Sequence, residues 1–230
     1  MKKKLVFLTG AGVSAESGIR TFRDADGLWE QYPVMDVCSA TGFRRNPALV
    51  HQFYNERRRQ LGEVEPNAAH MAIARLAEKF DVMVVTQNVD NLHERAGVPA
   101  DRIIHLHGEL MKVRAIDDES RVYELCPPDV DTTPSTVIDG HCVRPHIVFF
   151  EEAVPMIEPA AREVAEADIL VVIGTSLNVY PAAGLINFAR RDAEIYYIDP
   201  APAAVASRVR VIAETATKGM EILEKELLEK

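Results

Sequence analysis

The chain has 230 residues, of which 47% are hydrophobic and 27% charged, and its formal net charge is −9. This length can bury one substantial core and leaves room for a small insertion. The acidic balance argues against a general nucleic-acid binder, which needs clustered Lys and Arg for phosphate contacts. Since no apolar run is long enough for a signal peptide or a membrane span, we expect a cytoplasmic protein without a membrane partner. Nothing in the residues specifies an oligomeric state.

Short runs rich in Val, Ile and Leu alternate along the chain with segments of helical periodicity. Such runs, without period-two alternation, are typical of strands buried on both faces of a parallel sheet. We predict buried strands at Lys4–Leu8, Asp81–Thr86, Ile169–Ile173 and Glu194–Ile198, and an alternating strand at Ile103–His107. The predicted helices are Ala48–Leu61, Asn67–Lys79, Asn91–Ala96, Pro159–Glu166, Pro181–Arg191 and Thr217–Leu228. The order predicts an α/β fold with a Rossmann-like, doubly wound parallel sheet.

Two segments interrupt this pattern. Residues 24–66 contain one predicted helix, and residues 112–145 carry scattered charges and prolines without clear periodicity. We assign both to a small insertion domain, made of a helical part and a degenerate zinc-like module. Residues 1–23, 67–111 and 146–230 then form the Rossmann-like domain.

The first strand runs into a glycine-rich turn. Gly10, Gly12 and Ala15 fit the G-x-G-x-x-G/A pattern, in which small residues and a helix N-terminus admit a pyrophosphate. An ordinary tight turn fits the same three positions. The continuation favours a dinucleotide site, because it supplies a polar, basic and aromatic cluster for the second half of a nucleotide: Ser14, Ser17, Gly18, Arg20, Phe22 and Arg23.

The predicted helix Ala48–Leu61 carries an arginine on its apolar stripe. Arg57 lies between Tyr54 and Leu61 on that stripe, whereas Arg58 and Arg59 are expected to be solvated. A guanidinium that faces a core needs an anionic partner, since an unpaired buried charge is costly. That partner is either an internal carboxylate or a ligand carboxylate, the latter bound with help from the Tyr54 hydroxyl.

Two further strand ends carry polar side chains. After the second strand, Asn88 and Asp90 can hold a carboxamide, a water molecule or ribose hydroxyls. The alternative is that Asp90 or Asn91 simply caps a helix. After Ile173, the small residues Gly174, Thr175 and Ser176 suit ribose or phosphate contacts, and a helix N-cap is the alternative.

A histidine ends the alternating strand. Histidine is the side chain best placed to act as a base near neutral pH, although a single histidine is more often structural. His105 is a rival on the same strand face. Gly108, directly after His107, favours His107, because close approach of a ligand needs a missing side chain.

The cysteines are candidate metal ligands. A structural zinc site needs two close pairs, and Cys126 and Cys142 each lack a nearby second cysteine. A mixed site with His141 is conceivable, but we expect free thiols and no zinc.

These segments together resemble the sirtuin family, the NAD-dependent protein-lysine deacylases. The resemblance runs in order from Gly10 to the stretch Ala216–Gly219. The matching motifs are Gly10–Ser14 with Ser17–Ile19 and Phe22-Arg23, then Gln87–Asp90, His107–Glu109 and Gly174–Ser176. The bacterial class III type is most similar, through Asp26–Trp29, Phe53–Asn55, Arg57–Gln60 and Pro66–His70.

The resemblance implies a role for each matching position. NAD is expected to contact Gly10, Ala11, Gly12, Ser14, Ser17, Phe22, Arg23, Gln87, Asn88, Asp90, Gly174, Thr175, Ser176, Asp199 and Ala216. The catalytic residues are expected to be Asn88, Asp90 and the general base His107. Tyr54 and Arg57 are expected to recognise acidic acyl groups. The acyl-lysine protein substrate is expected to add as a strand along His146–Phe150, with Val148, Phe149 and Phe150 in contact with it.

The implied reaction removes an acyl group, succinyl or malonyl and possibly acetyl, from lysine and releases nicotinamide and O-acyl-ADP-ribose. The chain departs from the family at Glu151, where the peptide-binding segment has glycine, and at Asp199, where it has asparagine. Asp199 favours NAD over NADP, because a carboxylate repels a 2′-phosphate. If Glu151 excludes peptides, a protein mono-ADP-ribosyltransferase is the alternative, and a non-catalytic regulator that binds NAD or ADP-ribose is a third hypothesis.

Overall fold

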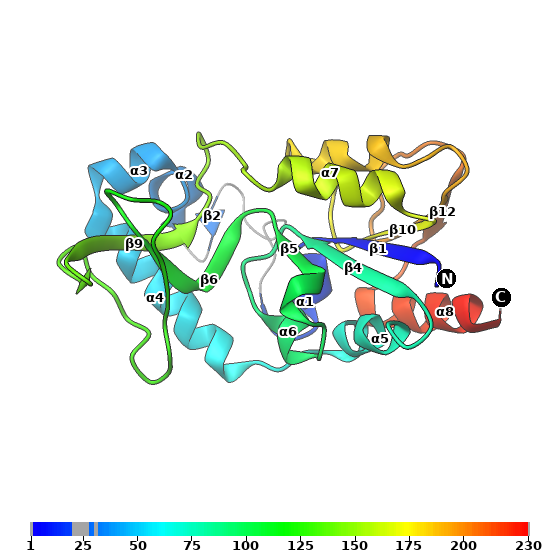
Figure 1. Cartoon of the computed structure of the whole chain (residues 1–230), viewed down its shortest axis with the longest axis horizontal. Coiled ribbons are helices and arrows are strands. Elements are labelled where there is room, and N and C mark those ends of the chain that lie inside the picture. Colours follow the sequence, from blue (N-terminus) through cyan, green and yellow to red (C-terminus); the bar gives the residue numbers. More distant parts are fainter. Residues whose placement is uncertain (1, 20–27, 30–31, 230) are drawn as a thin grey trace.

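The computed structural model describes residues 2–19, 28–29 and 32–229. It places a layered α/β unit beside a smaller unit that combines helices with an antiparallel sheet (Figure 1). Across these described ranges, every helix is too short or too polar to cross a membrane.

The larger unit is built on a six-stranded parallel sheet in the order β12–β11–β10–β1–β4–β5. This sheet confirms the predicted fold class. Its strands are β1 (Lys4–Thr9), β4 (Asp81–Thr86), β5 (Ile103–His105), β10 (Ile169–Ile173), β11 (Glu194–Ile198) and β12 (Val209–Ile212). The bounds predicted for β4, β10 and β11 are correct, whereas β12, a short edge strand with two exposed residues, was missed.

Successive residues of each strand point to opposite faces of this sheet, so both faces are apolar. Helices cover both of them. Leu5 and Phe7 of β1 pack in one core, and Val6 and Leu8 pack in the other. Figure 1 shows α5 and α8 below the sheet and α7 above it. The helices of this unit are α1 (Gly12–Ala15), α5 (Ala68–Leu76), α6 (Leu92–Arg95), α7 (Ile157–Glu166) and α8 (Ala216–Glu229), with 3₁₀ helices η2 (Ala100–Arg102) and η3 (Ala182–Phe188).

Two predicted elements of this unit were wrong in detail. The helix expected at Pro181–Arg191 is the 3₁₀ helix η3, in which the Gly184 N–H donates to the carbonyl three residues earlier, at Pro181. The strand expected to reach His107 ends at His105, because Gly108 takes a φ of +85° and redirects the chain into the other sheet.

The smaller unit contains more regular structure than the sequence indicated. Residues 24–66 were expected to hold one helix, yet their described part forms three: α2 (Val34–Val37), α3 (Ala40–Arg45) and α4 (Pro47–Glu63), beside the short pair β2 (Leu28–Trp29) and β3 (Tyr32–Pro33). The segment that lacked periodicity is largely an antiparallel sheet in the order β7–β6–β9–β8. Its strands are β6 (Gly108–Ala115), β7 (Val122–Glu124), β8 (Val137–Ile138) and β9 (His141–Ile147).

Buried arginines concealed this sheet in the sequence. Arg114 of β6 and Arg144 of β9 are direct partners in the ladder and are almost fully buried. The carboxylate of Glu152 accepts hydrogen bonds from both guanidinium groups, at 3.3 Å from Arg114 and 2.6 Å from Arg144. Because β6 and β9 each contain a buried arginine, their sequences have the polar pattern of exposed segments although these residues are buried.

Arg58 corrects the prediction that it is solvated. It is 1% exposed, and its guanidinium donates to the Leu110 carbonyl at 2.8 Å and to Asn55 Oδ1 at 2.8 Å. It also reaches Thr132 Oγ1, at 3.2 Å. Burial lowers the pKa of Arg58 to about 10. This arginine therefore joins α4 to the antiparallel sheet and to the loop before β8.

We expect Arg58→Ala to lower the free energy of unfolding by roughly 2–4 kcal/mol, because several charge-assisted hydrogen bonds are lost and their buried acceptors stay unpaired. Arg59→Ala is the matched control. Its guanidinium is about half exposed and forms a surface ion pair with Asp131, so its loss costs roughly 0–1 kcal/mol. Urea denaturation of both variants measures the difference, and equal effects would contradict a structural role for Arg58.

Candidate functional site

A cleft of about 600 Å³ lies where the carboxyl ends of β1, β4 and β10 meet the smaller unit. Ligands of open α/β sheets bind at this edge, and the volume lies within the range of small-molecule sites. The structure gathers most predicted site residues on its walls: Gly10, Ala11, Gly12, Ser14, Tyr54, Arg57, Gln87, Asn88, Asp90, His107, Val148, Phe149, Phe150, Gly174, Thr175, Ser176, Asp199 and Ala216.

Of the other predicted nucleotide contacts, Phe22 and Arg23 lie outside the described residues. Ser17 is not among the lining residues, and its hydroxyl accepts a hydrogen bond from Asn67 Nδ2 at 3.0 Å. In this structure Ser17 therefore helps to join the loop after α1 to the start of α5.

The loops after β1 and β10 form the floor of the cleft. The Gly10 N–H donates to the Ile173 carbonyl at 3.0 Å, and the Gly12 N–H donates to the Gly174 carbonyl at 2.8 Å. A Cβ at Gly12 would lie 2.6 Å from Gly174 Cα, so this packing requires glycine. Both N–H groups are thus engaged within the protein, and the glycines act here by letting the two backbones approach each other.

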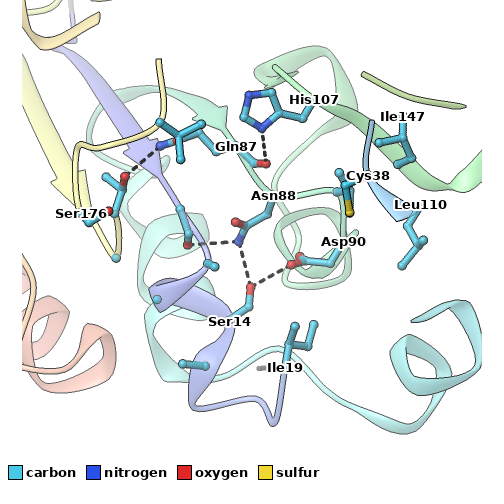
Figure 2. A pocket seen from close by; sticks show the side chains of 18 of the residues that line it. Ser14, Ile19, Cys38, Gln87, Asn88, Asp90, His107, Leu110, Ile147 and Ser176 are labelled. Atoms are coloured by element: carbon cyan, nitrogen blue, oxygen red, sulfur yellow. Dashed lines mark hydrogen bonds between the residues drawn. The ribbon is translucent and has the colours of Figure 1, made fainter. Parts of the chain in front are cut away.

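Ser14 connects the two polar residues that follow β4 (Figure 2). Its hydroxyl donates to Asp90 Oδ2 at 2.9 Å and accepts from Asn88 Nδ2 at 3.1 Å. Burial raises the pKa of Asp90. The other carboxylate oxygen of Asp90 accepts from the Leu92 N–H at 3.1 Å, but the N-cap residue of α6 is Asn91, which makes no side-chain capping hydrogen bond. Asp90 therefore contacts the first turn of α6 from outside the cap position, and the Ser14 hydroxyl joins it to Asn88.

His107 points into the cleft with a defined ring orientation (Figure 2). Its Nδ1 lies 3.0 Å from the Gln87 carbonyl, to which it can only donate, so Nε2 carries the free lone pair. Burial lowers the pKa of His107, so the imidazole is neutral near pH 7 and its Nε2 atom can accept a proton. The rival His105 does not line the cleft and instead contacts Glu94.

The strand end after β10 faces the same space. Thr175 Oγ1 accepts from Gln87 Nε2 at 3.1 Å and from the Leu177 N–H at 3.3 Å, and the Thr175 carbonyl accepts from the Tyr197 hydroxyl. Asp199 is 1% exposed, and its Oδ1 accepts from the Ala201 N–H. These contacts fix the loops into which the resemblance places the adenosine half of NAD.

The far end of the cleft combines apolar walls with an unpaired cation. The Nε and Nη1 atoms of Arg57 are buried without a hydrogen-bond partner among the described residues, and its guanidinium lies 5.2 Å from the Phe53 ring centroid. The Tyr54 hydroxyl donates to Cys38 Sγ at 3.7 Å. Burial raises the pKa of Tyr54, and it raises that of Cys38 to about 12.

Sequence reasoning missed three side chains of this apolar wall. Cys38, Leu110 and Ile147 line the cleft, and Figure 2 shows them grouped on one side of it. Ile147 falls in the peptide-binding segment predicted from the sequence, so the sequence could have identified it as a lining residue. Cys38 had no signal, because it ends a one-turn helix that the sequence did not predict.

The segment expected to bind peptide runs along the rim of the cleft. The Val148 N–H donates to the His107 carbonyl, and Phe150 exchanges hydrogen bonds with Cys38 and Ala40. Glu151 adopts a φ of +77°, the left-handed region that favours glycine. Its carboxylate accepts from the Thr41 N–H at 2.9 Å, and this contact helps to hold the strained residue.

The residues of the zinc-like module do not fit a four-cysteine zinc site. Cys126 and Cys142 are both free and exposed, and neither belongs to a group of three possible metal ligands within the described part of the chain. We therefore derive no function from a metal at these thiols.

Comparison with known proteins identifies the family. The Sir2 family model matches residues 10–181. The chain belongs to the Sir2, or sirtuin, family. A Bacteroides thetaiotaomicron protein named NAD-dependent protein deacylase is 52% identical over 98% of both chains. A crystal structure of a Sir2 homolog–NAD complex has a TM-score of 0.87 and 36% identity, covering 99% of this chain and 90% of that one. A Sir2 protein bound to acetylated peptide has a TM-score of 0.82 and 27% identity, covering 100% and 95%.

His70, behind the cleft, predicts a pH dependence of stability. Its ring is fully buried with Nε2 3.4 Å from Ser14 Oγ, and burial lowers its pKa to about 4, from 6.5 for an exposed histidine. The unfolded chain therefore binds one more proton between these values, so stability falls as pH drops through that window. We expect His70→Gln, which keeps a residue suited to the capping box, to make this pH slope shallower by about one proton.

Chemical denaturation at pH values between 4 and 7 measures that slope. An unchanged slope in His70→Gln would show that other groups take up the proton.

Proposed function

We propose that this Sir2-family chain is an NAD-dependent protein-lysine deacylase that acts on acidic acyl groups, succinyl or malonyl, in preference to acetyl. One observation carries the acyl preference: two guanidinium nitrogens of Arg57, Nε and Nη1, are buried without a partner among the described residues, at the apolar end of the cleft. A buried cation without an anion is costly, and a ligand carboxylate would relieve that cost. The internal-carboxylate alternative finds no support, since no acid of the described residues pairs with Arg57.

The cleft accommodates the two substrates from opposite ends. NAD occupies the polar end, between the Gly10–Ser14 loop and the Gly174–Ser176 loop, with its nicotinamide half near Asn88 and Asp90. The acyl-lysine enters beside the rim strand Val148–Phe150, and its acyl group extends between Tyr54 and Arg57. Both ends are continuous within one cavity, which supports a reaction between the two substrates.

The first chemical step separates nicotinamide from the ribose. The amide oxygen of the acyl-lysine attacks C1′ of the ribose, and the C1′–N bond to nicotinamide breaks. Asn88 and Asp90, held in register by the Ser14 hydroxyl, orient the nicotinamide carboxamide. Ser14, Asn88 and Asp90 are hydrogen-bonded to one another before the substrate binds. Little further ordering of these side chains is therefore needed when the C1′–N bond breaks.

His107 then acts as the general base. Its neutral Nε2 accepts a proton from a ribose hydroxyl, whose oxygen attacks the carbon of the imidate formed in the first step. The Gln87 carbonyl, which accepts from Nδ1, stabilises the imidazolium that results. A positioned base of this kind contributes roughly 10²–10⁴-fold to the rate. Water releases the free lysine, and the second product is O-acyl-ADP-ribose.

Arg57→Met tests the acyl preference. We expect kcat/KM for succinyl- and malonyl-lysine peptides to fall by roughly 10–100-fold, since a charge-assisted hydrogen bond in a desolvated site is worth about 1.5–3 kcal/mol. Turnover of the matched acetyl peptide should change little, because an acetyl group has no carboxylate. Mass spectrometry of the deacylated peptides, with NAD present, measures both.

Arg59→Met is the control for that experiment. Arg59 is on the same helix but outside the cleft lining, so all three peptides should react as with the unmodified protein. Equal loss of acetyl and succinyl turnover in Arg57→Met would contradict the preference while leaving the deacylase assignment in place.

His107→Tyr tests the general base. We expect deacylated lysine to fall to background while the thermal unfolding midpoint stays close to the original, since His107 lines an open cleft. His141→Tyr, in the small sheet and outside the cleft lining, should keep full activity. Retained deacylation in His107→Tyr would move the base to another residue, with His105 the next candidate.

A further inference from the structure

A second cluster of chemistry-bearing side chains lies outside the cleft. Glu94 on α6, His105 at the end of β5 and Glu109 on β6 each place one possible ligand atom within 4.8 Å of the other two. None of the three lines the cleft. They come from separate elements, and β5 and β6 belong to different sheets.

The imidazole of His105 is oriented in the way that metal-binding histidines usually are. Its side chain is 10% exposed. Nδ1 lies 3.3 Å from the Asn88 carbonyl and can only donate to it, so the Nε2 atom is directed into the cluster, 2.7 Å from Glu94 Oε1. A ring N–H held by a backbone carbonyl is the common outer contact of a histidine ligand, because it fixes the tautomer that leaves the other nitrogen free to coordinate.

Glu94 supplies a second, independent indication. Its Oε2 atom is buried and has no hydrogen-bond partner among the described residues. A buried carboxylate oxygen without a donor is costly, and a cation bound by this carboxylate would satisfy it. Glu109 completes the set from β6, where its Oε2 forms an ion pair with the partly exposed Lys112, at 2.7 Å. That flexible lysine can turn to solvent without disturbing the sheet.

We propose that Glu94, His105 and Glu109 form a binding site for a divalent zinc-class ion. One imidazole nitrogen and two carboxylate oxygens are a donor set that suits Zn²⁺, with water at the fourth position. The three protein atoms donate their lone pairs to the ion, and the proton between His105 and Glu94 leaves to solvent. The ion connects α6 and the parallel sheet to β6 of the antiparallel sheet, at the histidine whose Nδ1 contacts the Asn88 carbonyl.

Zinc titration of the whole chain tests this site without reference to catalysis. The background carries Cys126→Ser and Cys142→Ser, which remove the exposed thiols as competing ligands. Isothermal titration with ZnCl₂ should show one ion per chain, and excess ZnCl₂ should raise the thermal unfolding midpoint. Glu109→Gln keeps the size and shape of the side chain but removes its charge. It should weaken zinc binding by about ten-fold or more and remove most of the thermal shift.

The matched control is His141→Gln. His141 is a second histidine beside a carboxylate, Asp117, but belongs to no group of three possible ligands in the described ranges. It should bind zinc as the background does. Equal affinity of the background and Glu109→Gln would overturn the proposal, as would loss of binding in His141→Gln or the absence of any zinc-dependent heat and thermal shift. Deacylation of peptides does not enter these measurements, so the two proposals fail separately.

Discussion

The close packing of the backbones after β1 and β10 determines where Ser14 and the polar groups around it lie. Gly12 and Gly174 touch so closely that a Cβ on either would meet the opposite main chain, and Gly174 adopts a φ of +65°. This contact fixes the short helix α1, and therefore Ser14, against the residues that follow β4. Asn88 and Asp90 are then oriented by one hydroxyl group rather than by separate loops. The hydrogen bonds of Ser14 with Asn88 and Asp90 therefore depend on this main-chain packing.

Helix α4 extends this arrangement to the acyl end. Successive residues of a helix differ by about 100° in direction, so adjacent arginines face different surroundings. Arg58 is enclosed by carbonyl and side-chain oxygens of the smaller unit and has a structural role. Arg57, one residue earlier, is directed at the cleft, where its buried Nε and Nη1 have no partner in the described chain. The rigid contact made by Arg58 holds α4 in place, and this allows Arg57 to remain available to a ligand.

The sequence predicted what depends on local pattern and missed what depends on contacts between distant segments. The apolar runs of β4 and β10 were located correctly because both faces of those strands are covered. Gly108 correctly singled out His107 over His105 as the residue on the cleft wall. The apolar stripe of α4 identified Arg57 but gave no sign that a loop near Thr132 buries Arg58 on the other side. The antiparallel sheet was missed because its buried arginines pair with Glu152, which lies outside the sheet, after its last strand.

The central claim is that the cleft recognises the negative charge of an acyl group, and a pair of peptides of equal size tests it most directly. Succinyl-lysine and its neutral amide, succinamyl-lysine, differ only in that carboxylate. With NAD saturating, we predict that kcat/KM is roughly ten-fold or more higher for the succinyl peptide, as loss of a charge-assisted hydrogen bond at Arg57 requires. Equal values for the two peptides, or a higher value for the amide, would contradict the account.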